Sequence, residues 1–301
     1  MTEALDTLLL ILKLEKIDEC LYRGVTPKTP NQRVFGGQVF AQAMRAAQDT
    51  VVAERAIHSQ QAYFLRPGDP LIPILYAVDK IRDGGSFTTR RVVASQRGKA
   101  IFSTSLSFQK REVGLNHQLD MPICPPPEEL SDDQVHWDQQ ASQVTKKTVH
   151  RHDFKPIEMR SVEPIDYLNP IVRAPQQHVW LRAKGQLERG ANTDSGLHQA
   201  VLAYASDYNL MSTALLPHAT SIFNQQLQPA SLDHAIWFHD DFRVDEWLLY
   251  AMDSPRASGS RGLNRGSFFS RDGRLVASTI QEGLMRIHPT QKPTSPNTPP
   301  D

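Results

Sequence analysis

The 301-residue chain has few of the features that mark several common protein classes. It contains only two cysteines, Cys20 and Cys124, which are too few for a disulfide framework or a cysteine-based zinc site. Its 33 basic and 33 acidic residues balance, so the overall charge does not indicate nucleic acid as a partner. No cluster of His, Cys and Asp has the spacing of metal ligands, and we expect neither a metal nor another cofactor.

No long apolar run is present that would indicate a membrane-spanning helix. Residues 8–12 are apolar, but Lys13 ends the run, far short of the roughly 20 residues that a span requires. Glu3 and Asp6 stand where a signal peptide needs positive charge, and residues 299–301 (Pro-Pro-Asp) do not form a peroxisomal Ser-Lys-Leu signal. We therefore expect a cytoplasmic protein without membrane insertion.

The chain divides into two halves around a segment with few periodic apolar residues. Residues 113–150 are rich in proline and acidic side chains, which is typical of a linker. This division predicts an N-terminal unit over residues 1–112 and a C-terminal unit over residues 151–288. Residues 289–301 are rich in proline, threonine and serine, and we expect this tail to be disordered.

Both halves show the same order of predicted elements, a helix followed by four strands. The helices are expected at residues 39–47 and 197–208, and the strands at 57–65, 72–82, 87–95 and 100–108, then at 234–239, 247–252, 262–270 and 275–285. An aromatic pair, a later tyrosine and two turns recur in the same order: Tyr63-Phe64 with Tyr76, and Trp237-Phe238 with Tyr250, each followed by Gly/Ser and Gly turns. Such self-similarity predicts an internal duplication.

A helix followed by a curled antiparallel sheet favours an α+β fold. A strongly twisted sheet can wrap around a helix that is apolar over a broad arc, and this arrangement is the hotdog. Two tandem units predict a double hotdog, in which the two halves bury apolar faces of their helices and sheets on each other.

Asp207 is the first candidate for chemistry. It lies on the flank of the second apolar helix, close to the helix C-terminus. The negative end of the helix dipole disfavours a carboxylate there, which raises its pKa and suits a general base. The competing interpretation is a solvated aspartate at a helix end, because most acidic side chains lie on the surface.

Ser231 and Gln281 are the other candidates, each near the end of a strand. Ser231, Asp233 and His234 invite comparison with a serine hydrolase triad. The chain has no G-x-S-x-G nucleophile elbow, and strand alternation directs His234 away from Ser231 and Asp233. We therefore interpret His234 and His239 as sheet or core residues. Gln281 alternates with small side chains, and its amide can bind a water, or be an ordinary strand-edge group, but it cannot act as a base.

Five motifs together resemble the acyl-CoA thioesterase II family, the TesB-like double hotdogs. They are VFGGQVFAQA (34–43), YFLRPGDP (63–70), ASDYNLM (205–211), LDHAIWFH (232–239) and STIQEGLMR (278–286). The resemblance extends from about residue 8 to residue 288. It implies a double hotdog that hydrolyses medium- to long-chain acyl-CoA without a covalent intermediate, and that forms a homo-oligomer, commonly a dimer or tetramer.

The resemblance also implies roles for particular residues. The catalytic set of the family falls on Asp207, Ser231 and Gln281. We expect Asp207 to draw a proton from the water that attacks the thioester, while Ser231 and Gln281 orient this water. The developing oxyanion requires N–H donors, and the amides of Gly36 and Gly37, before a helix, are candidates.

Arginines on the strands are candidates for holding the CoA phosphates through charged hydrogen bonds. Arg90 and Arg261 are the main candidates. For either one, a solvated charge at the edge of the sheet is an equally good interpretation.

The duplication predicts one working site per chain. Around the position that matches Asp207, the first helix carries Gln42, Arg45 and Ala46. No carboxylate matches there, so we expect the second half to carry the catalysis and the first half to supply a wall of the acyl tunnel.

Two other functions stay open at this point. A hotdog hydratase or dehydratase needs a histidine paired with an acid, but His198 lies on the opposite side of the helix from Asp207. A non-catalytic acyl-CoA-binding protein could share the fold, although all three polar residues are present. Release of free thiol from an acyl-CoA ester separates these functions.

Overall fold

The computed structural model describes residues 2–28, 32–142, 155–188 and 194–288. The predicted tail, residues 289–301, and the end of the predicted linker, residues 143–150, lie outside the described residues.

Both halves contain two strands, then a central helix, then a run of further strands. The first half contains α1 (Glu3–Leu12), β1 (Glu15–Asp18), β2 (Leu21–Gly24), α2 (Gly36–Gln48), β3 (Arg55–Phe64), β4 (Ile74–Asp83), β5 (Phe87–Gln96) and β6 (Lys99–Lys110). Between the halves lie η1 (Pro127–Glu129) and α3 (Asp133–Ser142). The second half contains β7 (Ile157–Ser161), β8 (Gln176–Ala183), α4 (Ser195–Ala205), η2 (Met211–His218), β9 (Leu227–Ser231), β10 (Asp233–Phe238), β11 (Leu248–Ser258), β12 (Arg261–Ser270) and β13 (Leu275–Ile287).

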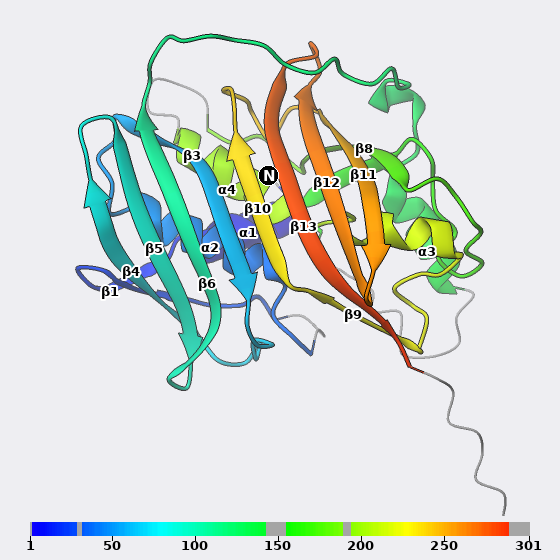
Figure 1. The fold of residues 1–301 in the computed structure, drawn as a ribbon, viewed down its shortest axis with the longest axis horizontal. Helices are drawn as coiled ribbons and strands as arrows, with labels where there is room; N and C mark the ends of the chain where they lie inside the picture. Colours follow the sequence, from blue (N-terminus) through cyan, green and yellow to red (C-terminus); the bar gives the residue numbers. More distant parts are fainter. Residues whose placement is uncertain (1, 29–31, 143–154, 189–193, 289–301) are drawn as a thin grey trace, which may run out of the picture.

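The strands of the described residues form one continuous 13-stranded sheet (Figure 1). At its centre β3 pairs with β10 in antiparallel register, with Gln61 opposite Ala235. Counted outward from this pair, the first half runs β6, β5, β4, β2, β1 and the second runs β13, β12, β11, β8, β7. Each strand of this order therefore has a counterpart in the other half, related by a two-fold axis through the central pair, whereas β9 lies off this order and pairs with β13. This arrangement confirms the predicted α+β fold with two curled units.

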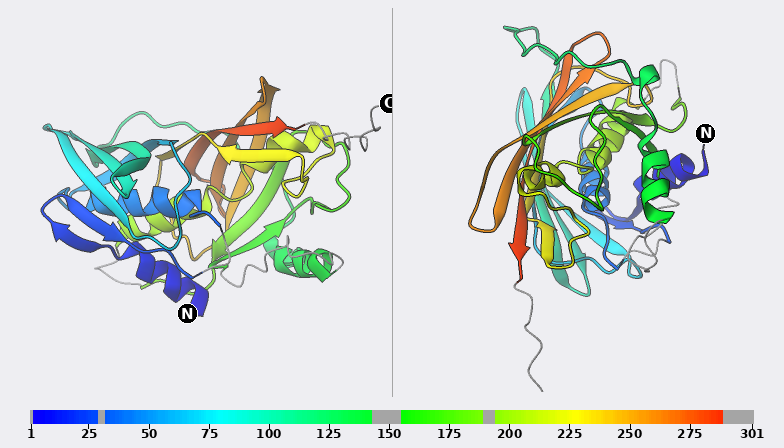
Figure 2. Two further views of the ribbon diagram at one scale, coloured as in Figure 1. Left: turned by 90° about the horizontal axis from the view of Figure 1, so that it is seen from below. Right: turned by 90° about the vertical axis from the view of Figure 1, so that its right-hand side faces the viewer.

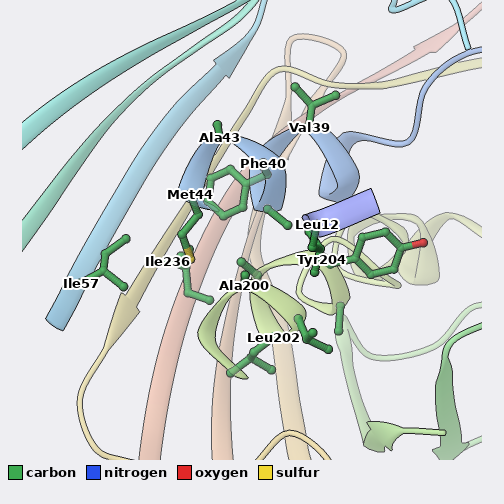
Figure 3. Packing of buried hydrophobic residues seen from close by; sticks show 14 of the residues in the cluster. Leu12, Val39, Phe40, Ala43, Met44, Ile57, Ala200, Leu202, Tyr204 and Ile236 are labelled. Carbon is green, nitrogen blue, oxygen red and sulfur yellow. The ribbon is translucent and has the colours of Figure 1, made fainter. Parts of the chain in front are cut away.

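The helices α2 and α4 lie on the same side of the sheet and pack against each other (Figure 2). The buried residues of α2 include four alanines beside a few large apolar side chains, so the helix can approach its neighbours closely. Figure 3 shows Phe40 and Met44 of α2 packed beside Ala200 of α4 and Ile236 of β10, all fully buried. Full burial of Phe40 or Met44 contributes about 1.5–3 kcal/mol each. This core fixes the relative position of the two helices.

The ends of α4 are defined by local hydrogen bonds. Asp194 caps the N-terminus, because its carboxylate accepts a hydrogen bond from Leu197 N–H at 3.0 Å. The helix ends at Ala205, and Asn209 then adopts a positive φ of 62°, which turns the chain away from the helix axis. Asp207 lies in this short turn. Among the residues that the structure describes, no helix is long and apolar enough to cross a membrane.

Candidate active site

Asp207 lies where the two halves meet, between the end of α4 and the start of α2. Its Oδ2 accepts a hydrogen bond from Gly37 N–H at 2.8 Å, and its Oδ1 accepts one from Gln281 Nε2 at 2.7 Å. Burial raises the pKa of Asp207 to about 6, although these two donors stabilise the ionised form and oppose the rise. The direction agrees with the expectation from the sequence, but the main cause is burial rather than the helix dipole.

Ser231 and Gln281 belong to two paired strands, and Gln281 contacts both Ser231 and Asp207. Ser231 is the last residue of β9, opposite Gly283 of β13. Gln281 in β13 is fully buried, and its Nε2 also donates to Ser231 Oγ at 3.1 Å. One amide group thus bridges the carboxylate and the hydroxyl. The three residues selected from the sequence lie in one hydrogen-bonded group.

Several acceptor atoms in this group have free capacity. Each oxygen of Asp207 accepts one hydrogen bond from the protein, so each can still accept another from a water. Gln281 Oε1 and Asn264 Oδ1, which face each other across β12 and β13, are buried without a hydrogen-bond partner in the described part of the chain. Because buried polar atoms are nearly always paired, these acceptors indicate a place where water or a polar group of a ligand binds.

The two predicted glycines lie directly against Asp207. A Cβ atom added to Gly36 would lie 2.7 Å from Asp207 Oδ2, and one added to Gly37 would lie 2.4 Å from the carbonyl oxygen of Tyr204. Only glycine therefore allows the first turn of α2 to approach the end of α4 so closely. The amide of Gly37 is bound to Asp207. The amide of Gly36 belongs to the first turn, where N–H groups have no partner within the helix, so it is the better candidate for an oxyanion donor.

An aromatic cluster borders these glycines. The ring of Phe35 lies between Tyr204 and Tyr208, with centroid distances of 5.1 Å and 5.0 Å. The sequence pattern gives no signal for this cluster, because its members come from the two different halves.

The two arginines predicted to hold phosphate have other partners. Arg90 is only 2 % exposed, and its Nη2 donates to Asp83 Oδ1 at 2.8 Å and to the carbonyl oxygen of Thr50 at 3.1 Å. These contacts favour a structural role for Arg90. Arg261 is more exposed and pairs with Glu282 at 2.9 Å, and phosphate binding by Arg261 stays a prediction.

The histidines do not pair with the carboxylate of Asp207. His234 is buried, its Nε2 lies 2.8 Å from Ser206 Oγ, and burial lowers its pKa to about 3. It is therefore a neutral core residue, as interpreted from the sequence. The Nδ1 of His198 accepts a hydrogen bond from Val244 N–H at 3.1 Å, so this histidine is engaged elsewhere. Within the described residues, no group of three or more His, Cys, Asp or Glu side chains is placed to hold a metal ion.

Gln48 is the counterpart of Asp207 in the first half. It follows Gly37 in α2 by as many residues as Asp207 follows Gly196 in α4. Each of the two side chains contacts the glycine at the start of the opposite helix: Asp207 accepts from Gly37, and Gln48 Nε2 donates to Gly196 O at 3.3 Å. The sequence pattern places this position too early in α2, at Gln42, Arg45 and Ala46, and that part of the prediction is wrong. The matching residue is again not a carboxylate.

Two family models match the chain. One, described as acyl-CoA thioesterase, matches residues 157–284, and the other, described as acyl-CoA thioesterase N-terminal domain, matches residues 25–109. Acyl-coenzyme A thioesterase 8 from Mus musculus is 42% identical over 93% of this chain and 88% of its own length.

Solved structures agree with these matches. The acyl-CoA thioesterase II TesB2 from Mycobacterium marinum is 40% identical and superposes with a TM-score of 0.77, over 95% of this chain and 100% of that chain. A protein with a hot dog fold from Alicyclobacillus acidocaldarius is 18% identical, with a TM-score of 0.71 over 95% of this chain and 99% of its own, and this likeness shows the fold alone. The chain therefore belongs to the acyl-CoA thioesterase II family.

Proposed function

We propose that this acyl-CoA thioesterase hydrolyses medium- to long-chain fatty acyl-CoA to free acid and CoA by direct attack of a water that Asp207 activates. The observation that carries the proposal is the carboxylate of Asp207, held by Gln281 and Gly37 with its pKa raised to about 6. At neutral pH such a group is ionised yet more basic than an ordinary aspartate, which suits a general base.

The chemistry follows from the free lone pairs of this group. A water donates a hydrogen bond to Asp207 and loses its proton to the carboxylate as its oxygen bonds to the thioester carbonyl carbon. Gln281 donates to Ser231 Oγ, which leaves the Ser231 hydroxyl hydrogen available to orient the water. The oxyanion accepts from the Gly36 amide. The oxyanion then reforms the carbonyl as the C–S bond breaks, and CoA leaves as a thiolate that takes the proton from Asp207.

Further parts of the proposal concern the whole chain. We infer units at residues 1–112 and 151–288 joined by a linker at residues 113–150, with the first unit forming a wall of the acyl tunnel. A homo-oligomer is supported by apolar side chains that stand fully exposed on the linker, Val113, Leu115 and Ile123. Two free cysteines agree with a reducing compartment such as the cytoplasm.

Thiol release from acyl-CoA esters of increasing chain length tests the proposed function. We expect release to be fastest with medium or long chains. Absence of release at every length would contradict the proposal and favour a binding protein. Hydration of an enoyl-CoA without thiol release would instead favour the hydratase alternative.

A further inference from the structure

A cavity of about 1110 Å³ opens around Gln48, on the side of the molecule that the two-fold axis relates to the catalytic cluster. Ile57 and Phe108 line this cavity and lie opposite each other in the β3–β6 pair. The pair Ala62–Thr104 of β3 and β6 corresponds to Ile236–Thr279 of β10 and β13. Counted by the same number of residues from these pairs, Ile57 and Phe108 correspond to Ser231 and Gly283, which lie opposite each other where β9 precedes β10. The cavity is therefore the counterpart of the active site in the first half.

The counterpart cavity lacks the groups that activate water. Gln48 replaces Asp207, and an amide cannot accept a proton as a base. Leu106 replaces Gln281. Leu106 lies two residues after Thr104, which pairs with Ala62 of β3, and Gln281 lies two residues after Thr279, which pairs with Ile236 of β10. The counterpart site thus has a cavity but lacks the carboxylate that could act as a base.

The lining of the cavity combines an apolar wall with a positively charged rim. Apolar side chains come from the end of α1 and the residue pair after it, from the loop between α2 and β3, and from the start of β3: Leu12, Leu14, Val51, Val52, Ala56 and Ile57. Six cationic residues and three acidic ones complete it. Arg45 pairs with Asp194 and Lys16 pairs with Asp49, whereas Lys13 and Lys110 are exposed and form no ion pair within the described part of the chain.

We propose that this cavity is a second, non-catalytic binding site for acyl-CoA. The apolar wall takes the acyl chain, and Lys13 and Lys110 hold phosphates through charge-assisted hydrogen bonds. The volume is ample, because pockets for ligands of moderate size occupy about 300–1,000 Å³. The class of ligand rests on the proposed function, whereas the existence of a second site rests on the cavity and its charges.

The test is the number of acyl-CoA molecules bound per chain. Isothermal titration calorimetry with a long-chain alkyl-CoA thioether, which cannot be hydrolysed, is expected to give two molecules per chain of the full-length wild type. Lys110→Glu and Lys13→Glu each weaken the second event about tenfold or more, the size expected for one lost charged hydrogen bond. Ala56→Trp, which fills the cavity, removes it. Lys99→Glu is the matched control, because Lys99 is exposed at the other end of β6, and it keeps both events.

Several outcomes would overturn the inference. Binding of only one molecule per chain by the wild type would contradict it. So would a second binding event that Ala56→Trp leaves intact or that Lys99→Glu also weakens. Free CoA and decanoate are titrated separately: if either alone fills the second site as tightly as the thioether, the site is for that fragment and not for acyl-CoA. Thiol release by the wild type is measured on the same sample, so failure of the second site with normal turnover is distinct from failure of the proposed function.

Discussion

The Gln281→Met variant is expected to shift the acid limb of the pH–rate profile to higher pH. In the wild type we expect this limb to report Asp207, whose pKa is about 6 because burial outweighs the hydrogen bond that Gln281 donates. Methionine has a similar size but cannot donate this bond. A hydrogen bond to a charged group contributes about 1.5–3 kcal/mol, and one pKa unit corresponds to about 1.4 kcal/mol. Losing it raises the pKa of Asp207 by about 1–2 units, so a higher pH is needed to ionise the base.

The assay is kcat/KM for thiol release from one acyl-CoA, measured across the pH range for wild type and variant. The plateau of the variant also falls, because Ser231 loses its donor, but the position of the limb does not depend on the plateau. Gln61→Met is the control, since Gln61 is exposed on β3, and its limb stays in place. A Gln281→Met limb at or below the wild-type pH would refute the assignment of the limb to Asp207.

Three further predictions follow from the same contacts. Ser231→Ala lowers kcat about tenfold to hundredfold by loss of one orienting hydrogen bond with little change in KM, and Ser231→Thr restores it; full activity of the alanine variant would rule out the role. Gly37→Ala lowers the melting temperature, because its Cβ would meet the Tyr204 carbonyl oxygen at 2.4 Å and overpacking costs about 1–3 kcal/mol; Gly85→Ala, with nothing within 4 Å, does not. Asp207→Asn gains stability relative to the wild type as pH rises from about 4 to about 7. The pKa of Asp207 is raised from 3.8 to about 6 in the folded state, so its ionisation lowers the free energy of unfolding of the wild type by about 1–3 kcal/mol. A difference in melting temperature between the variant and the wild type that stays constant with pH would count against this.

Local patterns in the sequence were sufficient for most of the fold and for the side of the sheet on which Gln281 lies. Alternation in the last strand places Gln281 with Thr279, and both are buried. The strands β8 and β9 are not predicted from the sequence, since β9 contains Pro229 and is held mainly by its pairing with β13. Such pairing depends on residues distant in the chain, which local patterns do not contain.

The contacts between the halves could not be predicted from the sequence. The hydrogen bond from Gly37 to Asp207 joins the start of one helix to the end of the other, and no periodicity records that approach. The register between the helices also needs the structure, because the contacts of Asp207 with Gly37 and of Gln48 with Gly196 show which positions of α2 and α4 correspond. The alternation of β5 could not decide whether Arg90 points inward.

Thiol release by wild type and by Asp207→Asn tests the role of Asp207 most directly. The substitution keeps the size of the side chain and removes the base, and Asp240→Asn, at an exposed surface carboxylate that pairs with Arg274, serves as control. With each variant shown to be folded by its melting temperature, we predict that Asp207→Asn lowers kcat at least about a hundredfold, as for a lost general base, while Asp240→Asn keeps wild-type activity. An Asp207→Asn enzyme that releases CoA within a few-fold of the wild-type rate would contradict water activation by Asp207.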